Sequence, residues 1–199
     1  MQQKSLRSDW KEITVVFLTT LILVFDRYRN LIPDRLLNTI VLYFVLPLIV
    51  IAVIFRESPA QYGIRLGEWK IGLGITLVAI LGISLVIPFV VQLKGFHEYY
   101  GSASKAVLPL IMRVGAEMFS WEFFFRGFLF FALYRIAGIH AIWLQAVPFT
   151  MAHFGKPEFE TFTCIFGGSA FGFVAWRTKS FLYPFLIHTY LGALTIFLS

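Results

Sequence analysis

The fold class is decided by the run Ile71-Gly-Leu-Gly-Ile-Thr-Leu-Val-Ala-Ile-Leu-Gly-Ile-Ser-Leu-Val-Ile-Pro-Phe-Val-Val91, which contains no charged residue. A helix crosses the hydrocarbon core of a bilayer with about 20 predominantly apolar residues, so this run is long enough to span a membrane. Its one proline, Pro88, lies close to its end. We therefore predict a membrane-spanning helix over residues 71–91.

The composition of the whole chain agrees with this prediction. Hydrophobic residues make up 58% of the 199 residues and charged residues only 14%, compared with about 45–50% and about 25% in soluble domains. These values and a mean hydropathy of +0.77 exclude an ordinary soluble globule and a disordered chain. The single cysteine, Cys164, excludes a disulfide scaffold.

Six more apolar stretches accompany the first one along the chain, interrupted by few charged residues. They are Ile13–Phe25, Leu36–Phe55, Ala106–Leu133, Ile139–Phe154, Phe162–Trp176 and Phe181–Leu198. We predict an all-α, polytopic transmembrane bundle of about seven spans, or six if the short first stretch lies in the membrane interface. Within this single membrane domain, residues 1–105 are expected to supply N-terminal scaffold spans and residues 106–199 the motif-bearing core.

The net charge of +6 has a topological explanation. In a soluble protein it would suggest nucleic acid, but here Lys and Arg lie between apolar runs, where they fix topology and meet anionic lipid head groups. We expect the bilayer to be a partner and nucleic acid not to be one. With seven spans, slightly more Lys and Arg, including Lys4 and Arg7, fall in the segments on the same side of the membrane as the N-terminus. This asymmetry favours a cytoplasmic N-terminus.

Ionisable residues within the apolar stretches collect in the second half of the chain. They are Glu117, Glu122, Arg126, His153 and His188. Each charge inside a span costs about 2.5–3.5 kcal/mol on insertion, so such residues often serve a function. Glu122 and Arg126 are four residues apart and share one helix face, which suits either a neutralising ion pair or a functional site.

Two histidines and one or two glutamates are a suitable set for activating water. A carboxylate in a low-dielectric site can take a proton from water, and a histidine can share that proton or donate to an oxyanion. The same set could bind zinc, but the HExxH spacing of zinc proteases is absent. No GxSxG or GxxxxGK motif occurs either. We expect neither a metal nor an organic cofactor.

Other features of this half of the chain indicate packing. The phenylalanines at positions 123–125, 128, 130 and 131 are expected to pack and to contact lipid. Gly167, Gly168 and Gly172 are expected to let helices approach closely. Gln145 suits either a packing hydrogen bond or a substrate contact.

Three short motifs resemble those of the CPBP family, the CAAX prenyl endopeptidase and bacteriocin-processing membrane proteins, also called Abi. Trp121-Glu-Phe-Phe-Phe-Arg-Gly-Phe-Leu129 resembles the first motif, EExxxR, and Phe149 to His153 matches the second, FxxxH. His188 falls where the third motif, HxxxN, has its histidine. The likeness extends over about Leu108 to Leu191.

This resemblance implies a glutamate-dependent intramembrane endopeptidase, that is, a hydrolase that is itself an integral membrane protein. Carried over by position, Glu122 is the second glutamate and Arg126 the arginine of the first motif. His153 is then the histidine that activates water with a glutamate, and His188 the one that stabilises the oxyanion. The resemblance also suggests a bacterial cell membrane.

Two residues depart from the family pattern. The first glutamate is Trp121 here, and the asparagine of the third motif is Gly192. Glu117 lies one helical turn before Trp121 and is a candidate for the missing carboxylate, although its side chain would lie about 6 Å further along the helix axis. Thr189 or Tyr190 could donate to an oxyanion in place of the asparagine.

Two functions follow as hypotheses. The first is a peptidase that cleaves a lipidated tail, a leader peptide or a sorting segment of a membrane protein, with Glu122, Glu117, His153, His188 and Arg126 as its catalytic residues. The second is a non-catalytic scaffold or accessory protein for maturation or transport, which the departures at Trp121 and Gly192 favour. The sequence indicates no oligomeric state.

Overall fold

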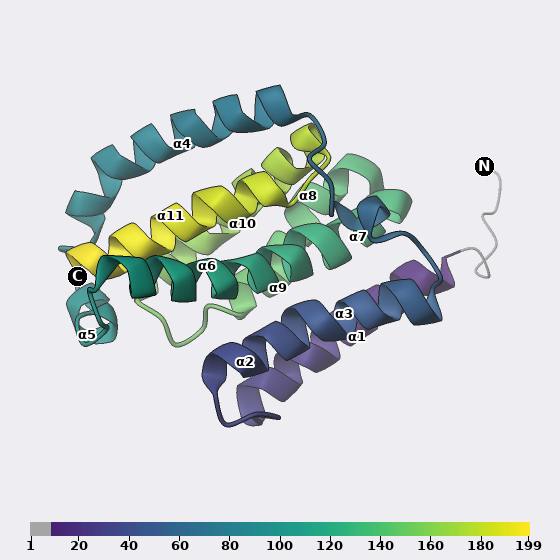
Figure 1. Cartoon of the computed structure of the whole chain (residues 1–199), viewed down its shortest axis with the longest axis horizontal. Helices are drawn as coiled ribbons and strands as arrows, with labels where there is room; N and C mark the ends of the chain where they lie inside the picture. Colours follow the sequence, from purple (N-terminus) through teal and green to yellow (C-terminus); the bar gives the residue numbers. More distant parts are fainter. Residues whose placement is uncertain (1–8) are drawn as a thin grey trace.

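The computed structural model describes residues 9–199, which form an α-helical bundle without a β-strand in that range (Figure 1). The elements are α1 (Trp10–Tyr28), α2 (Arg35–Ile40), η1 (Val41–Val45), α3 (Leu46–Ile49), η2 (Val50–Ile54), η3 (Pro59–Tyr62), α4 (Trp69–Val90), α5 (Phe96–Tyr100), α6 (Val107–Glu122), η4 (Phe123–Leu129), α7 (Phe130–Ala137), η5 (Gly138–His140), α8 (Ala141–Leu144), α9 (Ala146–Met151), α10 (Glu158–Thr178) and α11 (Leu182–Leu198). The predicted all-α bundle is thereby confirmed. Residues 1–8, with Lys4 and Arg7, lie outside the described residues.

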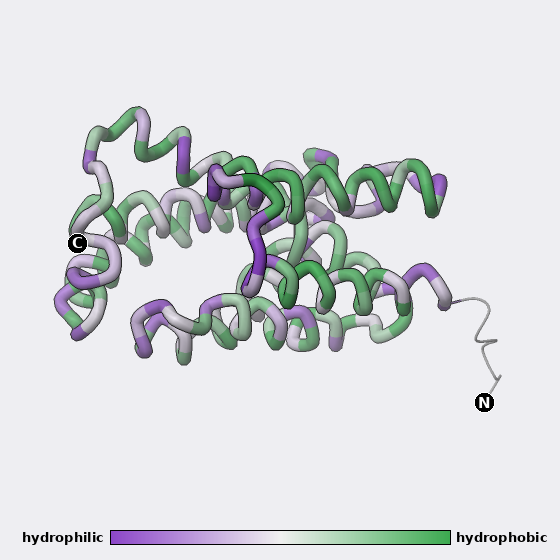
Figure 2. The backbone as a smooth tube through the Cα atoms, turned by 90° about the horizontal axis from the view of Figure 1, so that it is seen from below, coloured by the Kyte–Doolittle hydropathy of each residue, from purple (hydrophilic) through white to green (hydrophobic). Residues whose placement is uncertain are grey.

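Three helical stretches of the described chain are long and apolar enough to cross a membrane. They are Arg35–Ile54, Trp69–Val90 and Val107–Leu144, and Leu182–Leu198 is a shorter apolar helix. With 22 residues, α4 is about 33 Å long, which matches the thickness of a bilayer core. Figure 2 shows long hydrophobic helices with hydrophilic residues gathered mostly near their ends. The total of seven spans stays a prediction.

The helices lie side by side in layers (Figure 1). α4 forms one edge of the bundle and packs against α11 and α10. α11 also packs against α6, and α10 packs against α8 and α9. α1 and the α2–α3 stretch form the opposite edge, where α1 contacts η4 and α7. The helices that carry the ionisable residues are therefore the central ones.

The stretch Ile139–Phe154 differs from its prediction as a continuous span. It is divided into η5, α8 and α9, with an interruption at Gln145. Pro148 explains the division, because a proline has no N–H and its ring clashes with the carbonyl four residues earlier, here that of Leu144.

Two long helices contain π-helical turns. η1 and η2 lie on either side of Pro47, a residue that disturbs the hydrogen-bond ladder of a helix. The third such turn, η4, covers Phe123–Leu129 and directly follows Glu122. Such turns occur frequently at functional sites.

The phenylalanine run lies inside the bundle rather than at its surface. The phenylalanines at positions 123–125, 128 and 130 are fully buried, and Phe131 is nearly so. The expected lipid contact is therefore wrong for these residues, and the expected packing is confirmed. Apolar side chains suit lipid and protein interior equally well, so the sequence pattern does not separate the two.

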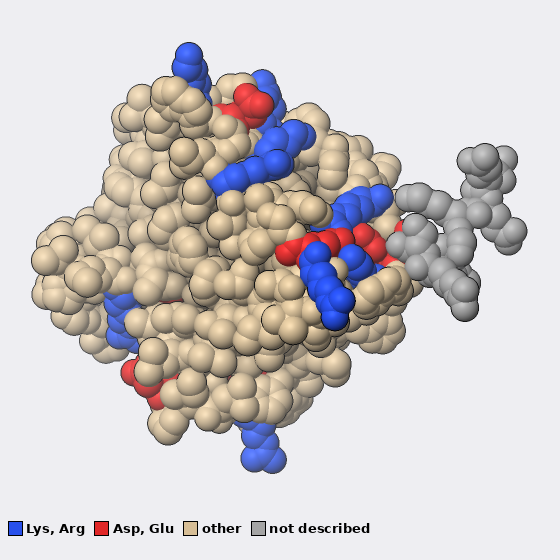
Figure 3. Space-filling model, turned by 45° about the vertical axis from the view of Figure 1, so that its right-hand side comes forward, with Lys and Arg blue, Asp and Glu red and all other residues tan. Residues whose placement is uncertain are grey.

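Polar contacts lie near the ends of the long helices. At one end, the Glu57 carboxylate accepts hydrogen bonds from Lys11, Tyr62 and Arg135, which joins α1, η3 and α7. On the face seen in Figure 3, charged side chains form separate patches and the surface between them is uncharged. This distribution suits a protein surrounded by lipid.

Candidate active site

Glu122, Arg126 and His188 meet inside the bundle. Oε1 of Glu122 accepts a hydrogen bond from Arg126 Nη1 at 3.0 Å and lies 2.6 Å from His188 Nδ1. Glu122 and Arg126 have no exposed surface, and His188 is also buried. The structure thus brings together three of the five residues singled out from the sequence.

Two features of the sequence produce this meeting. The four-residue spacing of Glu122 and Arg126 keeps their side chains together at the start of η4. α11 runs antiparallel to α6 and lies against it, which brings His188 to Glu122 (Figure 1). Gly192 helps this approach, because a Cβ at that position would lie 3.2 Å from Val114 Cγ1.

The hydrogen bonds fix which nitrogen of each histidine carries a proton. His153 Nδ1 lies 2.8 Å from the carbonyl oxygen of Phe149, which can only accept, so Nδ1–H is the donor and Nε2 keeps its lone pair. His188 Nδ1 donates in the same way to the Glu122 carboxylate. Nε2 is therefore the nitrogen that each histidine has left for a substrate or water.

The Phe149 ring lies between the two histidines. Its centroid is 4.5 Å from that of His153 and 6.0 Å from that of His188. The guanidinium carbon of Arg126 lies 3.9 Å from the same centroid, a cation–π contact. His153 therefore belongs to the same cluster as the other three residues, although it makes no direct hydrogen bond to them among residues 9–199.

Trp121 covers His153. The two rings are edge to face, with centroids 5.3 Å apart, and the indole is only 7% exposed. On the other side, Lys156 Nζ lies 6.0 Å from the centre of a Trp121 ring. The residue that replaces the expected first glutamate is thus a wall of the site.

Glu117 lies apart from the cluster. It is half-buried and has no hydrogen bond or ion pair to the histidines or to Arg126 within the described part of the chain. Burial lowers the pKa of the Lys156 ammonium, but Glu160 more than offsets this, with a smaller contribution from Glu117, and holds that pKa above its ordinary value. Glu117 is therefore close to Lys156, at the border of the site.

Several buried polar atoms of the site have no hydrogen-bond partner in the described structure. They are Oε2 of Glu122, Nε of Arg126, Oε1 of Gln145 and the hydroxyl of Thr189. Such atoms are costly to leave unpaired, so they suit water or a bound ligand. By contrast, the Tyr190 hydroxyl hydrogen bonds to Ser84 of α4 at 2.6 Å and faces away from His188.

Gln145 belongs to the site, although its sequence pattern left its role open. Its Nε2 donates to the carbonyl oxygens of Gly168 at 2.7 Å and Ile142 at 2.9 Å. Arg126 Nη2 donates to the same Gly168 oxygen at 3.3 Å. The signal in the sequence was an amide side chain within an apolar stretch, which needs partners when buried.

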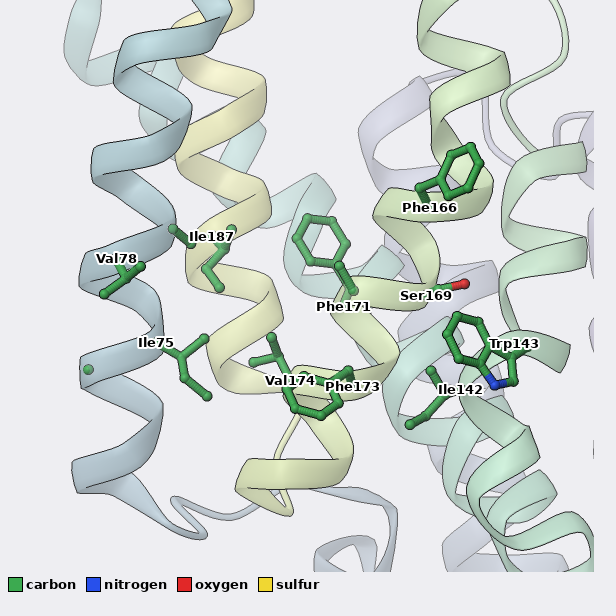
Figure 4. Close-up of a pocket in the computed structure, with 13 residues that line it drawn as sticks. Ile75, Val78, Ile142, Trp143, Phe166, Ser169, Phe171, Phe173, Val174 and Ile187 are labelled. Atoms are coloured by element: carbon green, nitrogen blue, oxygen red, sulfur yellow. The ribbon is translucent and has the colours of Figure 1, made fainter.

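An apolar groove of about 710 Å³ borders the cluster between α4, α8, α10 and α11 (Figure 4). Phe171 and Ile187 line it, and the Phe171 ring centroid is 5.1 Å from that of His188. The Phe171 ring therefore separates the groove from the charged pair. Ser169 is the one lining residue with a hydroxyl, which already donates to Ile165, and Trp143 adds an indole N–H.

Metal binding has no evident set of ligands. Among residues 9–199, no group of three or more His, Cys, Asp and Glu side chains is arranged to hold a metal ion.

Comparison with known families agrees with the motifs. Residues 103–194 match the family model described as type II CAAX prenyl endopeptidase Rce1-like. Over this region, just under half of the chain, it is similar to the CPBP family. At the level of the family, this similarity supports a membrane peptidase of the CAAX-protease type. No curated protein and no solved structure matches it. The matched region contains all five residues singled out from the sequence.

Two adjacent glycines of α10 provide a matched test of the packing around Phe149. A Cβ at Gly168 would lie 2.8 Å from Phe149 Cδ1 and 3.1 Å from Ala146 Cβ, whereas a Cβ at Gly167 would meet nothing within 4 Å. We expect Gly168→Ala to destabilise the folded chain by about 1–3 kcal/mol through overpacking. We expect Gly167→Ala to stabilise it by about 0.5–1 kcal/mol through helix propensity. Thermal unfolding in detergent measures both, and equal shifts would contradict the packing described here.

Proposed function

We propose that this chain is an intramembrane endopeptidase that hydrolyses a peptide bond with water activated by Glu122 and His153. The observation that carries the proposal is the state of the Glu122 carboxylate. One of its oxygens is anchored by Arg126 and His188, while the other is buried and has no partner in the described structure. A fixed carboxylate oxygen of this kind is suited to orient a water molecule.

The proposed reaction uses the free nitrogens of both histidines. Water, held by Oε2 of Glu122, attacks the scissile carbonyl carbon while His153 Nε2 takes the proton that water loses. The new C–O bond leaves an oxyanion. His188 takes up one proton from solvent at Nε2 before the reaction, donates this Nε2–H to the oxyanion and keeps the proton throughout. The C–N bond then breaks, and His153 returns its proton to the leaving amine. Arg126 holds the carboxylate in place, and Glu117 is proposed as a second carboxylate at the border.

We propose a substrate with an apolar segment next to the scissile bond, such as a lipidated tail of a membrane-associated protein. The groove beside His188 supports this choice. With its one hydroxyl already bonded and a single indole N–H at Trp143, it can satisfy few of the N–H and C=O groups of an extended peptide. A hydrocarbon chain carries no such groups and can lie in the groove at little cost.

The second candidate is a non-catalytic scaffold or accessory protein of the membrane. The observation that favours it is the position of Trp121, which covers His153 where the family pattern has a carboxylate. Glu117 also lies outside the cluster, where its charge acts on Lys156. In this alternative the cluster serves only to hold the helices together.

Cleavage of membrane proteins by the purified chain in lipid vesicles separates the two functions. Wild type is compared with His153→Ala, each with and without a chelator, and released peptides are identified by mass spectrometry. We expect peptides that require His153 and that persist with the chelator. Loss of cleavage with the chelator would indicate a metal-dependent mechanism instead. No released peptide from a folded wild type would support the scaffold.

A further inference from the structure

We propose that Tyr43 is a positioning residue that holds the Trp121 indole against His153, so that the N-terminal helices take part in the site. The inference rests on the proposed function for its kinetic readout only. Tyr43 and its hydrogen-bond partner Asp26 lie before residue 103, outside the region that matches the family. These helices are therefore more than the scaffold expected from their apolar sequences.

The first link is the contact of the Tyr43 ring with the motif-bearing helix. The ring is stacked on Phe124, with centroids 4.7 Å apart and planes at 10°. It also meets Trp121 edge to face at 5.5 Å. Tyr43 is 2% exposed, so the ring has little room to leave this position.

The second link is the hydroxyl of Tyr43, which fixes the ring from the other end. It donates to Oδ2 of Asp26 at 2.9 Å. Asp26 is itself held, because it accepts two hydrogen bonds from Arg35 and one from Asn38. The oxygen of the Asn38 amide in turn accepts from the backbone of the α1–α2 connection, at Leu31 and Ile32. The tyrosine is thus tied to a rigid group of polar residues.

The third link carries the effect to the reacting group. Trp121 lies between Tyr43 and His153 and touches both rings edge to face. A change in the tilt of the indole therefore alters the space next to His153, whose Nε2 is the proposed proton acceptor. Edge-to-face contacts favour particular ring angles, so the orientation is passed along the row.

The test uses Tyr43→Phe, which removes the hydroxyl but keeps the ring, and Tyr43→Leu, which removes both. Tyr183→Phe is the control, because the Tyr183 hydroxyl is also hydrogen-bonded, to Leu66 O at 2.7 Å, but on the α4 side of the bundle. The full chain is labelled with 5-fluorotryptophan, and Trp121→Phe identifies the Trp121 signal among those of the five tryptophans in the fluorine NMR spectrum.

We expect the Trp121 signal to shift in Tyr43→Phe, to shift further in Tyr43→Leu and to stay in place in Tyr183→Phe. For Tyr43→Phe, kcat should fall about three- to tenfold, as for the loss of one hydrogen bond, with little change in KM. An unmoved Trp121 signal in both Tyr43 variants would overturn the proposal, as would an equal loss of kcat in Tyr183→Phe. If wild type cleaves nothing, the proposed function fails, but the fluorine spectra still decide whether Tyr43 positions Trp121.

Discussion

Glu122→Gln should lower kcat/KM by about 10²–10⁴-fold, the range that general acid–base groups contribute. The substitution keeps the shape of the side chain and removes its charge, so the amide no longer polarises the water whose proton His153 takes. It also leaves the buried guanidinium of Arg126 without its partner at 3.0 Å. Rates are measured on the first substrate that the vesicle experiment identifies.

Two other glutamates are the controls for this prediction. Glu160 pairs with Lys156 at the border of the site, and Glu160→Gln should leave kcat/KM within about twofold because the residue lies outside the cluster. Glu117→Gln tests the proposed second carboxylate, since a loss comparable to that of Glu122→Gln would assign it a direct role. Full activity of a folded Glu122→Gln variant would contradict the proposed mechanism.

Arg126→Met should destabilise the folded chain by about 3–5 kcal/mol, the usual cost of removing one partner of a buried ion pair. Arg126 and Glu122 have no exposed surface, so the carboxylate left behind has no access to bulk water. The double variant Glu122→Gln/Arg126→Met removes both charges and should recover most of that loss. Unfolding by denaturant in mixed micelles measures the three variants.

The cycle also separates structure from chemistry. If Glu122 is catalytic, the double variant is stable but inactive like Glu122→Gln, whereas a pair that only neutralises two charges would leave it stable and active. A double variant as unstable as the sum of the two single variants would show that the ion pair is not the interaction lost. Gly168 O keeps its hydrogen bond from Gln145 in every variant. Loss of the Arg126 side chain therefore leaves no unpaired carbonyl at Gly168 that would add to the measured destabilisation.

Much of the fold was predictable because apolar runs of about 20 residues have few alternatives to a membrane helix. The pairing of Glu122 with Arg126 was also predictable, since residues four apart share a helix face. Their contact with His188 was not, because it joins residues 66 positions apart and depends on the packing of α11 against α6. The motif resemblance supplied that partner where periodicity could not.

Two misses have a physical explanation. The phenylalanine run was expected to touch lipid in part, but it is buried, and a bilayer and a protein core select the same residue types. Tyr43 was read only as part of the apolar stretch Leu36–Phe55. Its hydroxyl was the available signal, because a phenol inside a membrane helix needs a partner, although nothing in the sequence identified Asp26 as that partner.

The π-helical turn after Glu122 has a consequence for comparing this chain with related ones. A turn of this kind holds one residue more than an α-helical turn. Deleting a single residue within Phe123–Leu129 would restore the α-helical ladder and leave α7 facing nearly the same way, because the wider turn absorbs the extra residue. An insertion or deletion of one position here thus shifts the residue numbers after it while the same side chains still face the site. Sequence alignments across this segment should therefore allow a one-residue gap directly after the glutamate.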